Sequence, residues 1–272
     1  MKMRTPVNWA IIDAAAEPAL FTMLDELDPP HACLYADPVP DEIGRLAPWL
    51  VQVTPDVHSW LLKRETPWGI VVTSSVEMPA LRQHLRKYLH VQIPDEEKPV
   101  LFRFYDPRNI WAMLDILPPW DQHSFLGPVE TISTRYAGSE RTENFAALRE
   151  QYPRGSGSRR KMMQITSSQM EQLSEIFEQR YIDQLVEKMA EWQVENITID
   201  PDDVANTFRW LKAQGITDDR SIRGLFRLFC HKNCIAVASI PANYKAVLCD
   251  DAEEGVYKAE SLLIQEMGDV PL

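Results

Sequence analysis

The chain has 272 residues, of which 45% are hydrophobic and 25% are charged, and these proportions exclude a disordered or fibrous protein. A formal net charge of −12 argues against a general nucleic-acid binder, because a phosphate backbone must be met by a concentration of Lys and Arg, although a local basic patch stays open. Since no apolar run approaches the length of a signal peptide or of a membrane span, we expect a cytoplasmic protein that does not bind a membrane.

The first 136 residues alternate strand-like and helix-like segments. Short runs rich in β-branched and aromatic residues predict strands, and the segments between them carry apolar residues at helical spacing. This alternation is typical of an α/β lobe, so we expect a mixed, largely parallel sheet with flanking helices and one antiparallel hairpin around the turn PDEEK. The predicted strands cover residues 7–12, 32–35, 49–53, 69–73, 91–93, 100–105 and 129–136.

Capping residues mark the predicted starts of helices in this lobe. Asp13 follows the first strand and is expected to cap a helix whose apolar stripe includes Leu20 and Leu24. Asp106 is a second predicted cap, because Pro107 behind it is favoured at the first helical position. The further predicted helices cover residues 56–65, a segment from Ser74 or Ser75 to residue 89, and residues 107–117.

A polar stretch separates this lobe from the rest of the chain. It includes RGSGSRRK at residues 154–161, where Gly155 and Gly157 are expected to act as a hinge. A phosphate-binding loop would need a strand before it and a helix directly after it, so a solvated linker is the better interpretation. We therefore predict an α/β lobe over residues 1–139, a linker over 140–165 and an all-α lobe over 166–272.

Helix signals dominate the predicted all-α lobe, and no convincing strand pattern occurs there. Ser168 and Glu171 form a candidate capping box before a long helix that reaches residue 192. Asp200 is expected to cap the next helix, with a proline at its first position. The acidic residues near 200–203 and 218–219 are interpreted as helix caps rather than metal ligands. Two further helices are predicted, one from Thr217 and one over about 252–266.

The segment LFRFYDPR at residues 101–108 is the strongest local signal. With WAIIDAAAEP, ACLYAD, APWLVQV, WGIVVTS, LRQHLRKYL and FLGPV, it resembles the adaptor-chaperone family of type VI secretion effectors over about the first 135 residues. The resemblance implies a carrier that binds one cognate toxin in the cytoplasm and helps to load it onto a spike protein of the VgrG type. It implies no catalytic residue and no cofactor.

A physical interpretation of FRFYDPR needs no catalysis. In a strand, Phe102 and Phe104 would point to one sheet face, and Arg103 and Tyr105 to the other. Arg103 on a covered face would need a carboxylate partner, for which Asp13 and Asp106 are the candidates. A direct contact with a partner protein is the alternative. The predicted structural residues are Asp13, Arg103, Tyr105, Asp106, Pro107 and Arg108.

Neither a metal site nor a catalytic site is predicted. Cys230 and Cys234, with His231, resemble half of a zinc site, but no convincing fourth ligand accompanies them, so we interpret them as core thiols. His84 lies between two leucines of a helical face and is expected to be structural. No nucleophile elbow, phosphate-binding loop or dinucleotide fingerprint occurs. The cysteines expected to be reduced are Cys33, Cys230, Cys234 and Cys249.

Three functions remain open at this point. An adaptor would be expected to recognise its effector through the helical lobe, with Trp192, Phe208 and Trp210 as candidate anchors, although each also suits a helical core. A small α/β enzyme with a helical cap would place its site at the strand ends. An immunity protein would neutralise a toxin, and the −12 charge would suit a basic nuclease.

Overall fold

The chain folds into two compact units, Met1–Leu173 and Ser174–Leu272. The computed structural model describes residues 5–36, 38–152, 156, 162–192 and 199–268. The first unit extends past residue 139, where the predicted α/β lobe ends, and its bounds include the whole range 140–165 predicted as a linker. No helix in these described ranges is long and apolar enough to cross a bilayer.

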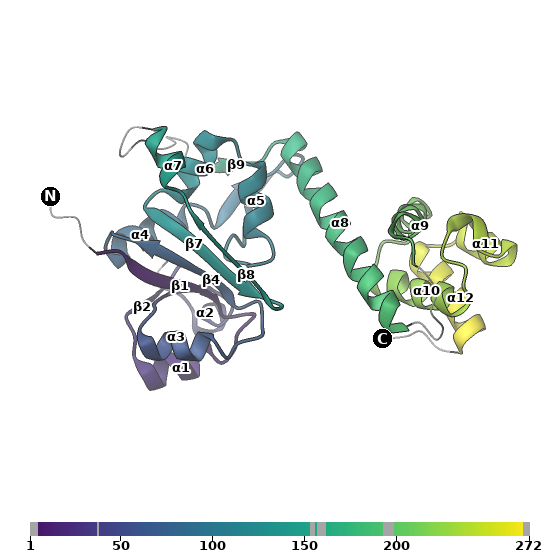
Figure 1. Ribbon diagram of the computed structural model, residues 1–272, viewed down its shortest axis with the longest axis horizontal. Helices are drawn as coiled ribbons and strands as arrows, with labels where there is room; N and C mark the ends of the chain where they lie inside the picture. Colours follow the sequence, from purple (N-terminus) through teal and green to yellow (C-terminus); the bar gives the residue numbers. More distant parts are fainter. Residues whose placement is uncertain (1–4, 37, 153–155, 157–161, 193–198, 269–272) are drawn as a thin grey trace. The chain divides into compact units, whose positions relative to one another are not determined.

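A six-stranded sheet forms the centre of the first unit (Figure 1). Its strand order is β2-β3-β1-β4-β7-β8, and every neighbouring pair is antiparallel. The prediction of a sheet with flanking helices is confirmed, but the prediction that this sheet is largely parallel is wrong. The strands are β1 (Val7–Asp13), β2 (His31–Cys33), β3 (Pro48–Gln52), β4 (Gly69–Ser74), β7 (Val129–Tyr136) and β8 (Ser139–Asn144).

The sheet is antiparallel because another strand lies between the strands that were expected to pair in parallel. Strands β3 and β4 both run antiparallel to β1, so they point in the same direction, as a helical crossover between them favours. They do not pair with each other, because β1 lies between them. In the same way β3 lies between β1 and β2. The alternation of strands and helices thus predicts the direction of successive strands, while the inserted strand converts each expected parallel pair into two antiparallel ones.

A second, three-stranded sheet lies in the same unit. Strands β5 (His90–Gln92) and β6 (Val100–Leu101) form the antiparallel hairpin predicted around PDEEK. Strand β9 (Met163–Gln164) pairs with β5 in parallel. The predicted strand over residues 100–105 therefore ends at Leu101, and the FRFYDPR segment continues outside any sheet.

Helices cover both faces of the large sheet (Figure 1). Along β1, Trp9 and Ile11 face one hydrophobic cluster, and Ala10 and Ile12 face another, which is the two-residue period of a strand. Helices α1 (Leu20–Leu27) and α3 (Pro55–Leu61) bury the second cluster, below the strands in Figure 1. The first cluster is larger, and its helices are α4 (Met78–Arg86), α5 (Ile110–Ile116) and α6 (Pro119–Leu126).

Residues 140–152 were predicted as part of the linker, but they carry secondary structure of the first unit. Strand β8 forms a hairpin with β7 through Ala137 and Gly138, whose φ angles of 49° and 74° suit a two-residue turn of type I′. Helix α7 (Ala146–Glu150) follows it, and the short helix α2 (Asp41–Gly44) lies earlier in this unit. Gly155, Gly157 and most of RGSGSRRK lie outside the described residues, so the hinge stays a prediction.

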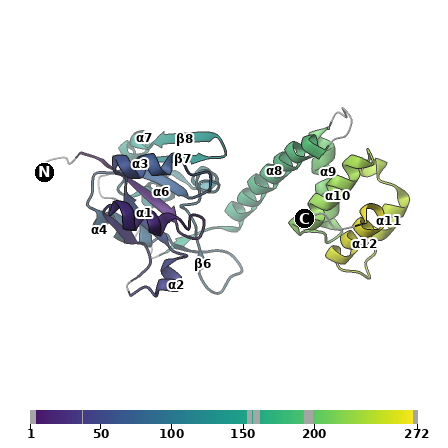
Figure 2. The same cartoon turned by 90° about the horizontal axis from the view of Figure 1, so that it is seen from below.

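The second unit is helical, as predicted (Figure 2). Its described residues contain no strand. Asp200 and Asp218 cap α9 and α10 with their side chains, which confirms their interpretation as caps. Helix α11 has no counterpart among the predicted helices. The elements are α8 (Ser167–Trp192), which begins in the first unit, α9 (Pro201–Ala213), α10 (Asp219–His231), the 3-10 turn η1 (Val237–Ser239), α11 (Ala242–Leu248) and α12 (Gly255–Met267).

The capping box of α8 lies two residues earlier than predicted. The Thr166 hydroxyl accepts from the Gln169 amide at 3.3 Å, and the Gln169 side-chain oxygen accepts from the Thr166 amide at 2.9 Å. These reciprocal bonds satisfy two amides that a helix start leaves unpaired. The predicted pair of Ser168 and Glu171 fits the same spacing, but it lies inside the helix.

Candidate functional site

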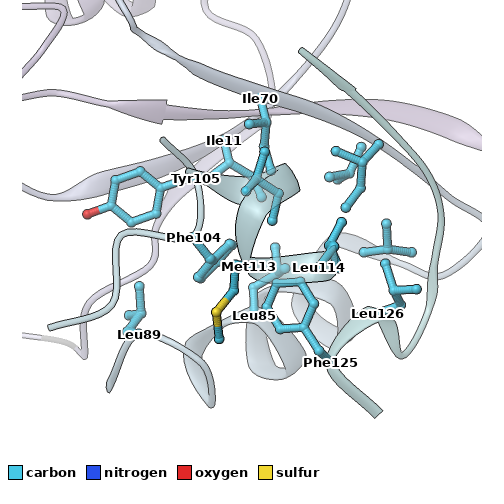
Figure 3. Close-up of a cluster of buried hydrophobic side chains, with 14 of the residues drawn as sticks. Ile11, Ile70, Leu85, Leu89, Phe104, Tyr105, Met113, Leu114, Phe125 and Leu126 are labelled. Atoms are coloured by element: carbon cyan, nitrogen blue, oxygen red, sulfur yellow. The ribbon is translucent and has the colours of Figure 1, made fainter. Parts of the chain in front are cut away.

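The FRFYDPR segment forms a turn that points two consecutive aromatic rings into one core. The Asp106 amide donates to the Arg103 carbonyl at 3.0 Å, which closes the turn. Phe104 and Tyr105 are each 1% exposed and belong to the same hydrophobic cluster, although a strand would place them on opposite faces. Their ring centroids are 5.5 Å apart, and Phe104 lies 5.7 Å from the ring of Phe125 (Figure 3). The predicted alternation over residues 100–105 is therefore wrong.

Asp13 is buried at the end of β1 and pairs with Arg103. An Arg103 guanidinium nitrogen donates to the carboxylate of Asp13, whose side chain is 2% exposed, whereas that of Arg103 is 42% exposed. Of the two carboxylates expected to pair with Arg103, the structure places Asp13 against it. Asp13 also accepts from the Ala15 amide at 3.1 Å. It does not cap α1 as predicted, because a turn intervenes and Ala19 takes the cap position.

Asp106 and Arg108 form a second pair inside the turn. The buried Asp106 carboxylate accepts from the Arg108 amide, from Nε at 2.9 Å and from Nη2 at 2.7 Å. Such a two-point contact fixes the guanidinium plane as well as its charge. Helix α5 begins at Ile110, three residues after the predicted start, with Asn109 in the cap position. Asp106 and the buried Pro107 therefore stabilise a turn before the helix and are not its cap and first residue.

Two tyrosines complete the polar group around Asp13. Burial, followed by the negative charge of Asp13, raises the pKa of Tyr35 and of Tyr105 above the ordinary value. Figure 3 shows the Tyr105 hydroxyl directed away from the apolar cluster. Both phenols therefore stay protonated at neutral pH and can donate hydrogen bonds. We call Asp13, Tyr35, Arg103 and Tyr105 the Asp13 cluster.

Side chains also hold the backbone beside this cluster. Arg82 of α4 donates to the carbonyl oxygens of Cys33 at 2.6 Å and of Tyr35 at 2.9 Å. These bonds fasten the end of β2 to the helix that covers the large hydrophobic cluster. Because the Arg82 guanidinium binds both carbonyl groups, these two bonds fix where Tyr35 lies relative to Asp13.

The FLGPV segment, which runs from the last turn of α6 into β7, is held together with Ser124 through carbonyl groups. His84 Nε2 lies 2.7 Å from the Phe125 oxygen, and the Tyr88 hydroxyl donates to Ser124 at 2.6 Å. Burial lowers the pKa of His84, so its ring is neutral at pH 7 and Nε2–H serves as the donor. Arg149 of α7 donates to the carbonyl groups of Gly127 and Val129. His84 thus has the structural role that its position in the sequence favours.

The anchors predicted in the helical lobe are largely covered. Phe208 is buried in the core of the second unit, with its ring 5.3 Å from that of Tyr181. Trp192 and Trp210 are half-buried and pack against the same core. The large apolar side chains that the described residues of this unit expose were not predicted as exposed; they are Phe177 on α8, and Val256, Tyr257 and Ile264 on α12.

The cysteines are free thiols. Cys230 and Cys234 are buried, and burial raises the pKa of both thiols. Cys230 Sγ lies 3.7 Å from the Met189 carbonyl oxygen. Within the part of the chain that the structure describes, no three His, Cys, Asp or Glu side chains gather as metal ligands would.

The Asp13 cluster and the FRFYDPR turn fall within one continuous stretch of sequence. Residues 8–124 match the model of the family described as a domain of unknown function, DUF4123. The matched stretch begins in β1 and ends in α6, so it excludes β7, β8 and the whole second unit. No curated protein and no solved structure matches the chain. The match thus covers the Asp13 cluster and the FRFYDPR turn, but none of the helical lobe.

Proposed function

We propose that this chain is a non-enzymatic, cytoplasmic adaptor-chaperone of a type VI secretion system. It binds a cognate toxin effector and promotes loading of that effector onto the VgrG spike. The DUF4123 match over residues 8–124 carries the proposal, because this family is linked to adaptors of type VI secretion effectors. The matched stretch includes the buried Asp13 and the FRFYDPR turn, which carries Arg103 and the buried Asp106.

The chemistry of the Asp13 cluster favours a binding role over catalysis. Asp13 and Asp106 are each neutralised by an arginine, and the raised pKa of Tyr105 keeps its phenol from acting as a base. A catalytic site of the kind an α/β enzyme carries needs an activated nucleophile or a base with room for a substrate. The Asp13 cluster and the Asp106–Arg108 pair instead fix a turn and leave two half-exposed guanidinium groups, Arg103 and Arg108, at the surface.

Co-purification from the source bacterium tests the proposal. A tagged full-length chain is expected to retain the toxin encoded beside it, with the adjacent spike protein joining in a ternary complex. Two results together would favour the immunity function. The chain would form a stable complex that abolishes toxin activity, and export of the toxin would not depend on the chain. Turnover of a small molecule by the purified chain, lost on Asp13→Asn with the fold retained, would favour the enzyme. Failure to retain either neighbouring protein contradicts the adaptor.

A further inference from the structure

We draw no further inference here: the strongest candidate, the surface patch of exposed apolar side chains Val256, Tyr257 and Ile264 on α12, carries nothing because nothing in the part of the chain that the structure describes shows what covers it.

Discussion

Arg103→Ala is expected to destabilise the first unit more than Asp13→Asn, because the two partners differ in exposure. The side chain of Asp13 is 2% exposed, and that of Arg103 is 42% exposed. Removing Arg103 leaves a carboxylate that water does not reach. Neutralising Asp13 leaves a guanidinium that solvent still reaches, and the substituted side chain can still accept from the Ala15 amide.

The free energy of unfolding that Arg103→Ala removes lies between two known limits. Removing one partner of a fully buried pair costs about 3–5 kcal/mol, whereas a fully exposed pair is worth about 0–1 kcal/mol. Since one partner is buried and the other is half-exposed, we expect about 2–3 kcal/mol for Arg103→Ala and about 1 kcal/mol for Asp13→Asn. The double variant should resemble Asp13→Asn, because the uncompensated carboxylate is gone.

Urea unfolding of the full-length chain at pH 7 measures these values. Arg135→Ala is the matched control, because that arginine is 43% exposed in the same unit but pairs with Glu140, whose side chain is 70% exposed. It should cost no more than about 1 kcal/mol. The reasoning is refuted if Arg103→Ala costs no more than Arg135→Ala, or if the effects of Arg103→Ala and Asp13→Asn simply add.

Three further predictions concern other parts of the chain. Burial lowers the pKa of His84, so the unfolded state takes up a proton that the folded state resists, and the free energy of unfolding should fall as the pH drops below about 6.5. Urea unfolding at pH 7 and at pH 5 measures this loss, and His84→Gln should reduce it. An unchanged pH dependence in His84→Gln would contradict the prediction. Thr166→Ala should cost about 1 kcal/mol in the same assay because it removes the cap of α8, whereas an equal loss on Ser168→Ala would restore the capping box predicted from sequence. Chelation with EDTA should leave the melting temperature unchanged, and a fall accompanied by release of zinc would show that Cys230 and Cys234 bind metal.

Most strands of the first unit were predictable, but the pairing of strands in the large sheet was not. The alternation of Trp9, Ala10, Ile11 and Ile12 between two cores follows from apolar residues on both sides of one strand. Which strands become neighbours depends on long-range packing, and no local pattern indicates that β1 inserts between β3 and β4. Strand β8 was missed because its side chains are polar and mostly exposed, so it carries no apolar alternation.

The candidate site was predictable in its composition and not in its geometry. A buried charge needs a partner, and this rule alone narrows the partner of Arg103 to two carboxylates. The aromatic residues of FRFYDPR favour a strand, yet the hydrogen bond from Asp106 to the Arg103 carbonyl makes a turn that buries both Phe104 and Tyr105. Tertiary packing on α6 decides this outcome, and the local sequence does not encode it.

The exposed surface of the helical lobe was the least predictable feature. Aromatic size favoured Phe208 as an anchor, but the same property makes it a core residue once the helices pack. The spacing of Tyr257 and Ile264 was visible in the sequence. Its meaning depends on which face of α12 meets α10, and the contact of Gly224 with Leu263 sets that face.

Secretion of the cognate effector tests the central claim most directly. In the source bacterium, deletion of the chain should abolish release of the toxin encoded beside it into the medium, while the tube and spike proteins of the secretion system are still released. A plasmid copy of the parent chain should restore toxin release. Toxin secretion that continues at the parental level without the chain would contradict the adaptor function.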